Sequence, residues 1–578
     1  LILATAFAIT VLILFHDRHW VPEDDGYYAY IAERLVDGAV LHRDVQALHA
    51  GYVYIAHAVT LKLFGLDLVS LRYPLAVLTV VQVGLVVLLL LPRGAMAAAA
   101  AGLSMTALSY VQFLSPNANW YCLFLLVLVV CALAWRPRDD RWRLEILGFL
   151  IVTMFLFRQL NGVFVAIGTL TYLLMEVRSG ASGRSRLLGR CLIVVMTAGL
   201  AGYLLLKSDP VAWLAFGVWP VAMLVWAYRS VEAPNKDARR ILIRFSLGAL
   251  AALLPLLIYH GVTGSLADWF DDAVIAAFQL SEMRYVKKAA YWAYAYLAMG
   301  RIVAPETPAA VLNGVYWLAL SLAPAVLGLS VLRRLSRGSG ADQALHPLPF
   351  LAVFYAVVAV HYQAPAYLYF GVPATIAGLV WMFGDGLSIR RHFMPGAVCV
   401  VSAIGLFNHA GQPVAAHFAK IMNGARIAQV PSSGIPRSSL RIDGRHIPDY
   451  ILMLGIIERQ VGADETILTV PGDPQLNFLS GRKAPLRYPV LAYGLRRPNN
   501  VDESIKILAQ RPPKLVFYAP TWRRNTKYTD RVMAYVKQRY RRLDTPSLRF
   551  FEVYRYRAVT GSAYSPRRRQ PEARKKLR

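Results

Sequence analysis

The sequence predicts an α-helical polytopic membrane protein that ends in a small α/β domain outside the membrane. Of its 578 residues, 57% are hydrophobic, and a mean hydropathy of +0.43 is too high for an ordinary soluble protein. Uncharged apolar runs recur, each close to the roughly 20 residues that a helix needs to cross a ~30 Å hydrocarbon layer. They are Pro74–Leu91, Ala95–Leu114, Trp120–Ala134, Cys191–Leu206, Val211–Ala227, Phe245–Ile258, Ala309–Leu332, Pro347–Val360, Ala366–Phe383 and Phe393–Phe407. Two or three such runs would also suit core helices of a soluble protein, whereas this many predict about 11–13 membrane-spanning helices.

The first apolar run, residues 1–15, has neither an initiator Met nor a basic flank. Because no Ala-x-Ala-like cleavage site precedes the acidic motif that follows, we interpret this run as a truncated first span and not as a signal peptide.

The Lys and Arg residues of the connecting loops predict the orientation. Alternate connections are basic, among them Arg178–Arg190 and Arg229–Arg244, whereas Ser115–Asn119 and His361–Pro365 carry no Lys or Arg. Since basic connections remain in the cytoplasm, the two long outer loops (residues 16–73 and 259–308) and everything after about 409 are expected on the other side. We expect the protein in the inner membrane of a bacterium, where the side opposite the cytoplasm is the periplasm or the exterior.

We expect three parts in the chain: a membrane domain (1–408), an extracytoplasmic domain (409–560) and a basic disordered tail (561–578). Within the second part, three segments have helical periodicity and three have strand character, in alternation, which predicts an α/β domain. The helical segments are Ile447–Val461, Ser504–Gln510 and Arg531–Leu543, and the strands are Glu465–Val470, Lys514–Ala519 and Phe550–Tyr556. Residues 409–560 carry 25 Lys and Arg against 11 Asp and Glu. This charge suits anionic lipid head groups, phosphates or acidic glycans, and the outer location argues against nucleic acid as a partner.

One arginine stands between two unusually short apolar runs. Leu144–Phe157 and Gly162–Met175 have about 14 residues each, or ~21 Å at the helical rise, and Arg158 opens the turn between them. The turn is therefore expected below the outer surface, in a cavity, where an arginine needs a partner. A lipid phosphate is well suited to a guanidinium, and the alternative is an arginine whose side chain extends to the interface.

An acidic motif, Pro22-Glu23-Asp24-Asp25-Gly26-Tyr27-Tyr28, directly follows the first apolar run. On an extended or turn backbone, Asp24 and Asp25 point in different directions. One could act as a general base on an acceptor hydroxyl while the other holds the backbone, a metal or a sugar hydroxyl. The alternative is a structural N-cap for the helix that follows, which we expect over Tyr30–Val36 at the membrane interface.

Several short motifs together resemble those of GT-C superfamily glycosyltransferases. They include Asp24–Tyr28, Ile31–Leu35, His49–Tyr52, Leu71–Pro74, Phe157–Gly162, His361-Tyr362, Val470–Pro474, Phe478–Arg482, Pro512–Val516 and Phe551–Tyr554. The nearest similarities are to bacterial relatives of the dolichyl-phosphate-mannose protein mannosyltransferases and of the aminoarabinose lipid A transferase. The matching motifs are short and are spread over nearly the whole chain. Their order agrees with the expected topology.

The resemblance implies transfer of a sugar from a polyprenyl-phosphate donor to an envelope acceptor at the outer face. In the family an Asp of the first outer loop is the base, which corresponds to Asp24, and the next residue is often Glu where this chain has Asp25. Arg158 would bind the donor phosphate, with Arg72 as a further candidate. The remaining substrate-binding candidates are Tyr27, Tyr28, His49, Gln159, Asn161, His361, Tyr362 and Arg482. A lone interfacial histidine such as His49 is also commonly structural.

No metal site is predicted. The four cysteines, Cys122, Cys131, Cys191 and Cys399, lie inside apolar runs and have neither disulfide nor zinc-site spacing. Relatives differ in metal dependence, so the resemblance leaves a divalent cation (Mg²⁺ or Mn²⁺) open.

Three other classes of function compete with the glycosyltransferase. A transporter or flippase of lipid-linked sugars would explain the many spans, but it normally carries ionisable groups at mid-membrane and internal symmetry. An assembly factor of envelope polysaccharide synthesis and a polysaccharide ligase are the further alternatives.

Overall fold

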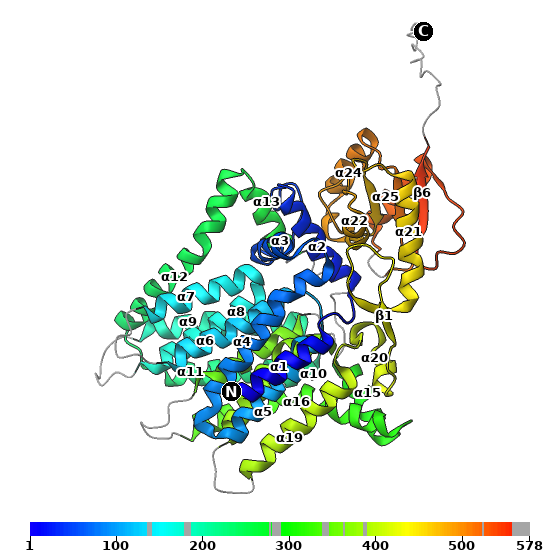
Figure 1. Ribbon diagram of the computed structural model, residues 1–578. Coiled ribbons are helices and arrows are strands. Elements are labelled where there is room, and N and C mark those ends of the chain that lie inside the picture. The colour runs from blue at the N-terminus through cyan, green and yellow to red at the C-terminus, as the bar shows by residue number, and fades with distance from the viewer. Residues whose placement is uncertain are drawn as a thin grey trace, which may run out of the picture.

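The computed structural model describes the chain except residues 136–141, 178–185, 277–278, 280–290, 338–345, 362–364, 385–389, 523–524 and 558–578. Long helices form one bundle, and the outer loops lie together with the C-terminal domain at one end of it (Figure 1). The expected tail (561–578) and the candidate Tyr362 lie outside the described residues.

The helices of the bundle coincide with the apolar runs of the sequence. They are α1 (Ile2–Phe15), α4 (Tyr73–Leu90), α5 (Ala95–Ala107), α6 (Ala118–Ala134), α7 (Arg143–Phe157), α8 (Gln159–Glu176), α9 (Leu187–Lys207), α11 (Val218–Ser230), α12 (Asn235–Val262), α16 (Pro308–Ser336), α17 (Pro347–Tyr355), α18 (Pro365–Phe383) and α19 (Arg390–Ile404). Short turns extend several of them, namely η2 (Leu91–Arg93), η3 (Tyr110–Gln112), α10 (Pro210–Ala212), η4 (Trp213–Gly217), η6 (Ala356–Val360) and η7 (Gly405–His409). In the described part of the chain, six helical segments are long and apolar enough to cross a membrane. The chain is a multi-pass helical membrane protein, as its apolar runs predicted.

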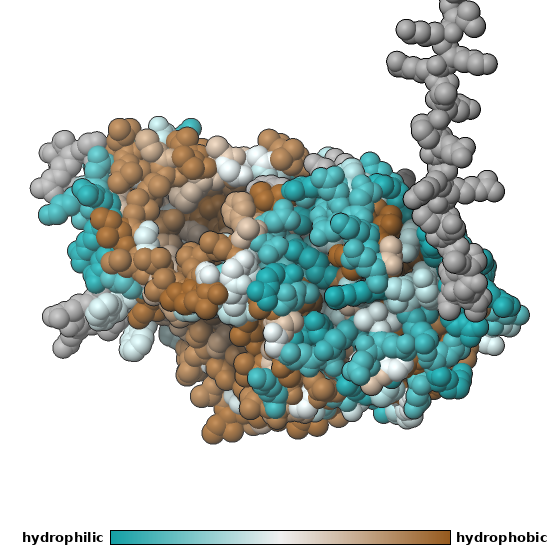
Figure 2. Space-filling model, turned by 90° about the horizontal axis from the view of Figure 1, so that it is seen from above, coloured by the Kyte–Doolittle hydropathy of each residue, from teal (hydrophilic) through white to brown (hydrophobic). Residues whose placement is uncertain are grey.

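The surface has two characters. Seen from the end that carries the C-terminal domain, that domain is hydrophilic, whereas the helical part beside it is largely hydrophobic and hollowed (Figure 2). Large apolar side chains such as Leu3, Leu206 and Val262 are more than three-quarters exposed. In water this exposure would be costly, whereas in a bilayer the same side chains contact lipid tails.

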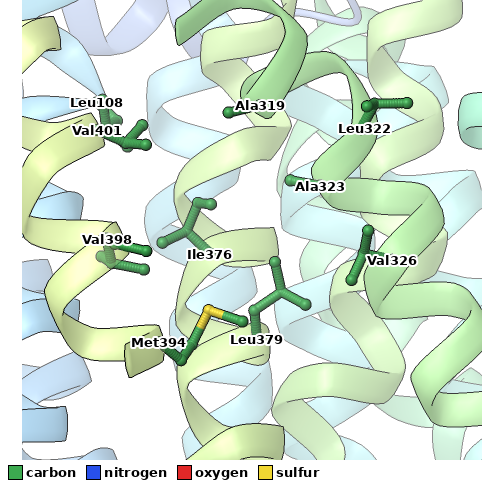
Figure 3. A pocket seen from close by; sticks show the side chains of 11 residues that line it. Leu108, Ala319, Leu322, Ala323, Val326, Ile376, Leu379, Met394, Val398 and Val401 are labelled. Carbon is green, nitrogen blue, oxygen red and sulfur yellow. The ribbon is translucent and has the colours of Figure 1, made fainter. Parts of the chain in front are cut away.

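A hollow of about 220 Å³ lies between α5, α16, α18 and α19 (Figure 3). Its walls are apolar, with Leu108, Leu322, Ile376 and Met394 among them. These walls suit hydrocarbon better than water.

The first outer loop is more helical than the sequence indicated. It forms α2 (Pro22–Val36), α3 (Tyr52–Phe64) and η1 (Leu68–Arg72). The expected turn before a helix at Tyr30–Val36 is wrong, because the helix begins at Pro22. A proline at the first helical position loses no hydrogen bond and has a suitable φ, so the acidic doublet lies in the first turn of α2. The second outer loop forms α13 (Leu266–Phe270), η5 (Asp271–Ile275) and α15 (Tyr291–Val303).

The C-terminal region contains two small sheets. Its elements are α20 (Val414–Met422), β1 (Gln429–Pro431), β2 (Arg441–Asp443), η8 (Gly444–His446), α21 (Ile447–Gln460), β3 (Ile467–Val470), α22 (Pro474–Ser480), α23 (Leu491–Gly494), α24 (Pro498–Gln510), β4 (Leu515–Tyr518), α25 (Lys527–Arg539), β5 (Tyr540–Arg542) and β6 (Glu552–Tyr556). Strands β1 and β2 pair antiparallel, and the larger sheet has the order β3-β4-β6-β5, in which only β3 and β4 are parallel.

The helix predicted over Arg531–Leu543 is too long. It ends at Arg539, and Tyr540 to Arg542 pair with β6 instead. Tyr540 is buried with its ring 5.2 Å from that of Tyr556. Packing on the sheet therefore outweighs the helical pattern at this end, and residues 409–560 remain our proposed extent of the domain.

The domain packs directly on the helix that bears the acidic doublet. Helix α2 lies between α3 and α22. A Cβ atom at Gly26 would lie 2.2 Å from the Cβ of Gln475 in α22. Any side chain at this position would push the two helices apart, which explains the glycine in the motif.

Candidate active site

The structure separates the two aspartates of the doublet. Asp25 is fully buried, its Oδ1 accepts a hydrogen bond from Nη2 of Arg72 at 2.8 Å, and its Oδ2 accepts from the N–H of Val21 at 2.8 Å. Arg72 also donates to the main-chain carbonyls of His16, Arg18 and His19. Burial raises the pKa of Asp25, and the guanidinium opposes that rise.

These contacts do not fit two of the expected roles. Arg72, expected to bind a donor phosphate, is fully buried and holds the chain between α1 and α2. Asp25, expected to be catalytic, neutralises that guanidinium and bonds the N–H at the start of α2. For Asp25 the structural alternative, a helix-terminus role, describes the contacts better.

Asp24 faces the other way and remains partly exposed. Its Oδ2 accepts hydrogen bonds from Oγ of Ser115 and Nδ2 of Asn117, each at 3.3 Å. Both partners belong to the short connection between α5 and α6, one of those without Lys or Arg. Neutral donors of this kind orient a carboxylate without adding a full opposite charge.

A row of amides connects Asp24 to the start of α8. Asn117 Oδ1 accepts from Nδ2 of Asn119 at 2.8 Å, and Asn119 Oδ1 accepts from Nδ2 of Asn161 at 3.1 Å. Asn161 also donates to the hydroxyl of Tyr355 at 3.3 Å. Asn161, which the sequence offered as a substrate ligand, thus lies buried behind Asn119 and supports the residues that hold Asp24.

Arg158 lies where two helices break, as the short apolar runs predicted. Its backbone is extended, with φ −154° and ψ 114°, between α7 and α8. The side chain is only 5% exposed, and its guanidinium carbon lies 5.6 Å from the ring centroid of Tyr367. A Cβ at Gly162 would approach the backbone of Phe155 to 2.6 Å, so glycine lets α7 and α8 pack closely around the break.

Tyr28 lies in the doublet helix next to Tyr54 and His49. Burial, then Tyr54 and the carboxylate of Asp24, raise the pKa of Tyr28, whereas the guanidinium of Arg158 lowers it. The Tyr28 hydroxyl lies 3.1 Å from Nε2 of His49, and the two rings are stacked. The doublet helix therefore contacts the rest of the first outer loop through Tyr28 and His49.

Arg158 and Lys207 influence the pKa values of two histidines. Burial and the charge of Arg158 lower the pKa of His49 to about 3, so its ring is neutral at neutral pH. Burial, Arg158 and Lys207 lower the pKa of His361 well below its ordinary value. Lys207, the last residue of α9, was missed by the sequence reasoning. Its place at the outer end of an apolar run was the signal that could have revealed it.

Gln159 connects this cluster to both outer loops. Its Nε2 donates to the main-chain carbonyl of Leu48 at 3.3 Å and to that of Ala273 at 2.9 Å. Tyr27, by contrast, has a structural contact, because its hydroxyl accepts a hydrogen bond from the N–H of Leu48 at 3.0 Å. Arg482 lies apart from this cluster's contacts and donates to the main-chain carbonyls of Ser480 and Val461.

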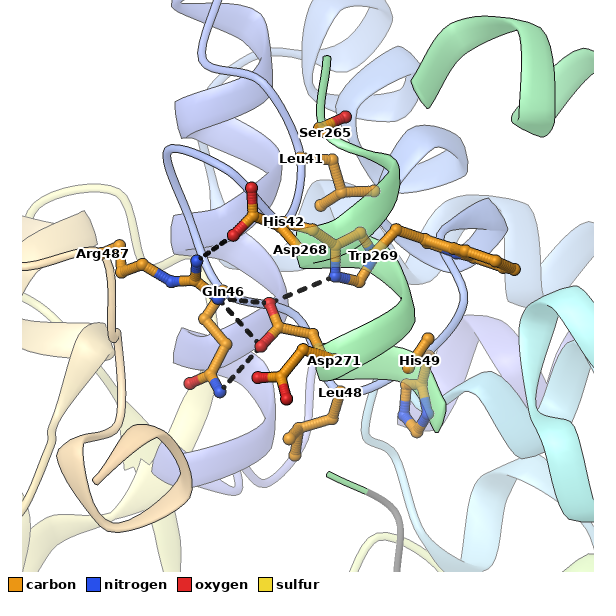
Figure 4. A network of polar contacts seen from close by, with 12 residues as sticks. Leu41, His42, Gln46, Leu48, His49, Ser265, Asp268, Trp269, Asp271 and Arg487 are labelled. Carbon is orange, nitrogen blue, oxygen red and sulfur yellow. Dashed lines mark hydrogen bonds and ion pairs between the residues drawn. The ribbon is translucent and has the colours of Figure 1, made fainter. Parts of the chain in front are cut away.

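An ion-pair network around the buried Asp272 joins the C-terminal domain to the second outer loop (Figure 4). Arg487 bonds both carboxylate oxygens of Asp272, at 2.9 and 3.0 Å, and one of Asp268 at 2.7 Å. Asp272 is fully buried and is also contacted by His42 and Gln46 of the first outer loop. Ala273, the residue after Asp272, accepts a hydrogen bond from Gln159. The network therefore extends to Gln159, which directly follows Arg158.

The described residues contain no group of three or more His, Cys, Asp or Glu side chains that could hold a metal ion.

These features define a multi-pass helical membrane protein with a GT-C-like fold, in which a row of amides connects the carboxylate of Asp24 to the helix that begins after the buried Arg158. Its structure is similar to that of ArnT, the aminoarabinose lipid A transferase, from Cupriavidus metallidurans bound to undecaprenyl phosphate. The TM-score is 0.52 at 14% sequence identity, over 96% of this chain and 97% of that chain. The apo structure of the same protein superposes with a TM-score of 0.37 at the same identity and coverage, which adds no support. No protein-family model matches the sequence, and no curated protein matches it.

Proposed function

We propose that this protein is a membrane glycosyltransferase that moves a sugar from a polyprenyl-phosphate donor to an acceptor of the cell envelope, with Asp24 as general base. The acceptor is a lipid, a glycan or a protein. One observation carries the proposal: Asn117, Asn119 and Asn161 connect Asp24 to the first turn of α8, directly after Arg158, in a fold that in ArnT binds undecaprenyl phosphate.

The chemistry is a single displacement at the anomeric carbon of the donor sugar. The acceptor oxygen forms a bond to this carbon while the bond to the phosphate oxygen breaks, and the polyprenyl phosphate leaves with the electron pair. Asp24 takes the proton of the acceptor hydroxyl, which requires hydrogen-bond reach. Ser115 and Asn117 hold the carboxylate in place for this step.

Charge on the leaving phosphate is stabilised by Arg158. A buried guanidinium pairs well with phosphate oxygens, and a preorganised positive charge acts more strongly where water is excluded. His361 and His49 line the same place as neutral rings, so they can donate or accept hydrogen bonds without adding charge. Arg72 and Asp25 bond each other and the main chain, and neither is part of the proposed substrate site.

The site opens to the outer leaflet in this proposal. The supporting argument is the charge of the loops: basic connections lie on the opposite side of the predicted topology from the acidic motif. We therefore place the protein in the bacterial inner membrane, with the site and C-terminal domain facing the periplasm or exterior.

The experiment compares a strain that lacks the protein with strains complemented by wild type, Asp24→Asn or Asp464→Asn. Asp464 is an exposed carboxylate of the C-terminal domain and serves as the matched control. Mass spectrometry of envelope lipids and glycans should show one product lost in the deletion strain. We expect wild type and Asp464→Asn to restore it, but not Asp24→Asn.

Binding separates an enzyme from a carrier. Native mass spectrometry of purified Asp24→Asn with undecaprenyl phosphate should show retained binding, because the phosphate ligands are unchanged. A transporter or flippase of lipid-linked sugars has no need of a base. Restoration of the product by Asp24→Asn would therefore reject the glycosyltransferase mechanism in favour of a carrier.

A further inference from the structure

Two adjoining hollows, of about 300 and 440 Å³, lie where the β1–β2 pair meets the membrane bundle. They share Arg426, Ile427 and Ala428 among their walls. In Figure 1, β1 and α20 lie at this junction, below the rest of the C-terminal domain. We call the combined space the basic groove, after the cations that line it: Arg18, Lys420, Arg426, Arg441 and Arg445.

The side chains that line the basic groove carry more positive than negative charge. Five cations face one lining carboxylate, that of Asp443. Asp443 is already contacted by Arg445, with Nε to Oδ1 at 3.0 Å, and by His417 at 3.3 Å. The charge of the remaining arginines and Lys420 therefore favours an anion in the groove.

Two of these arginines stand directly opposite each other. The N–H of Arg441 donates to the carbonyl of Asp17 at 2.7 Å, and the N–H of His19 donates to the carbonyl of Arg441 at 2.7 Å, so Arg18 and Arg441 form a parallel bridge pair. Like charges directly opposite on neighbouring strands are destabilising. Within the described residues, Nε of Arg18 is buried and has no hydrogen-bond partner. An anion seated between the two guanidinium groups would remove the repulsion and supply the acceptor.

The position of the basic groove indicates which anion. The guanidinium of Arg18 lies 4.8 Å from the ring centroid of Phe15, the last residue of α1. Arg426 donates to the carbonyl of Phe407 in η7, at the end of the α19 span. Phe407 is 69% exposed, as expected of a side chain that contacts lipid. The groove thus lies at the level where two spans end, which is the headgroup layer of the bilayer.

The basic groove is also connected to the candidate base. The carbonyls of Arg18 and His19 accept hydrogen bonds from Arg72, at 2.8 and 2.7 Å, and Arg72 holds Asp25, the neighbour of Asp24. A ligand that orders Arg18 therefore acts on the segment that positions the doublet.

We propose that the basic groove binds the phosphate-bearing headgroup of a membrane lipid.

The test uses the full-length protein in phosphatidylcholine nanodiscs that contain a small fraction of photo-crosslinkable phosphatidic acid. The variant is Arg18→Gln/Arg441→Gln. The matched control is Arg511→Gln/Arg541→Gln, which removes two exposed arginines elsewhere in the domain. Each cation near an anionic lipid contributes roughly fivefold to binding, so we expect about a thirtyfold drop in crosslinking for the groove variant only. An equal signal in both variants would overturn the proposal.

Inorganic phosphate distinguishes a lipid from a free ion. If millimolar phosphate abolishes crosslinking to wild type, the ligand is free phosphate and the lipid assignment falls. Unchanged crosslinking supports the lipid. Retention of undecaprenyl phosphate binding in Arg18→Gln/Arg441→Gln would show that the variant folds and that the donor site is intact.

The lipid site and the proposed function can fail separately. If Asp24→Asn leaves the envelope unchanged while the groove variant still loses crosslinking, the lipid site stands and the glycosyltransferase proposal alone fails.

Discussion

Replacement of Arg158 by alanine should weaken binding of undecaprenyl phosphate more than any other single change in the pocket. The side chain is only 5% exposed, so its interaction with a phosphate is little screened by water. Hydrogen bonds to charged groups contribute about 1.5–3 kcal/mol each, and a guanidinium can make two to one phosphate. A loss of about 3 kcal/mol corresponds to a Kd raised roughly 150-fold.

Two further variants make the result specific. Arg158→Lys keeps the charge but loses the paired geometry, so its Kd should rise only about tenfold. Arg482→Ala removes a guanidinium that the sequence also proposed as a ligand, but one that bonds carbonyls of Ser480 and Val461. It should bind undecaprenyl phosphate like wild type.

The assay is titration of purified protein in detergent with undecaprenyl phosphate, followed by native mass spectrometry. Size-exclusion profiles that match wild type show that a variant is folded. An unchanged Kd in folded Arg158→Ala, or an equal loss in Arg482→Ala, would refute the reasoning that places the phosphate at the helix break.

Three other predictions concern charge and pH. Asp25→Ala should lower thermal stability in detergent strongly, by about 3–5 kcal/mol, since it leaves the buried Arg72 unpaired; a melting curve like that of wild type would contradict the ion pair. Asp272→Arg should destabilise the network, and Asp272→Arg/Arg487→Asp should recover part of the loss; a double variant no better than the single one would argue against direct pairing. The pKa of His49 is lowered from 6.5 to about 3 in the folded protein, so as pH falls from about 6.5 towards 3 the unfolded state gains a proton that the folded state does not. Stability is lost in that window, and His49→Gln should show a flatter pH dependence of melting there.

The sequence predicted the bundle well because the membrane leaves few alternatives. A span must satisfy its backbone internally and present apolar side chains to lipid, so the uncharged runs coincide with helices. The break at Arg158 was predictable for the same reason, since two runs too short to span imply a turn below the surface. No comparable rule governs the outer loops, where α2 begins earlier than its pattern indicated.

The partners of Asp24 could not be predicted, because they come from distant parts of the chain. Ser115 and Asn117 follow Asp24 by 91 and 93 residues, and nothing in their local pattern refers to the doublet. A usable signal existed: a short connection without Lys or Arg, on the same predicted side, that contains several polar side chains. In the C-terminal domain the error at Tyr540 has the same origin, since only pairing with β6 distinguishes a strand from one more helical turn.

The doublet itself shows why local pattern underdetermines a site. Successive residues of a helix point about 100° apart, so one carboxylate of the pair turns to the buried Arg72 and the other to the partly exposed side. The sequence gives both residues the same chemistry, and only tertiary contacts divide the work between them. Asp25 fixes the first turn of α2 through Val21 and Arg72, and this fixed turn presents Asp24 to Ser115 and Asn117. Asp24 alone would be a base without the support of the first turn of α2. Asp25 alone would be a support without a base.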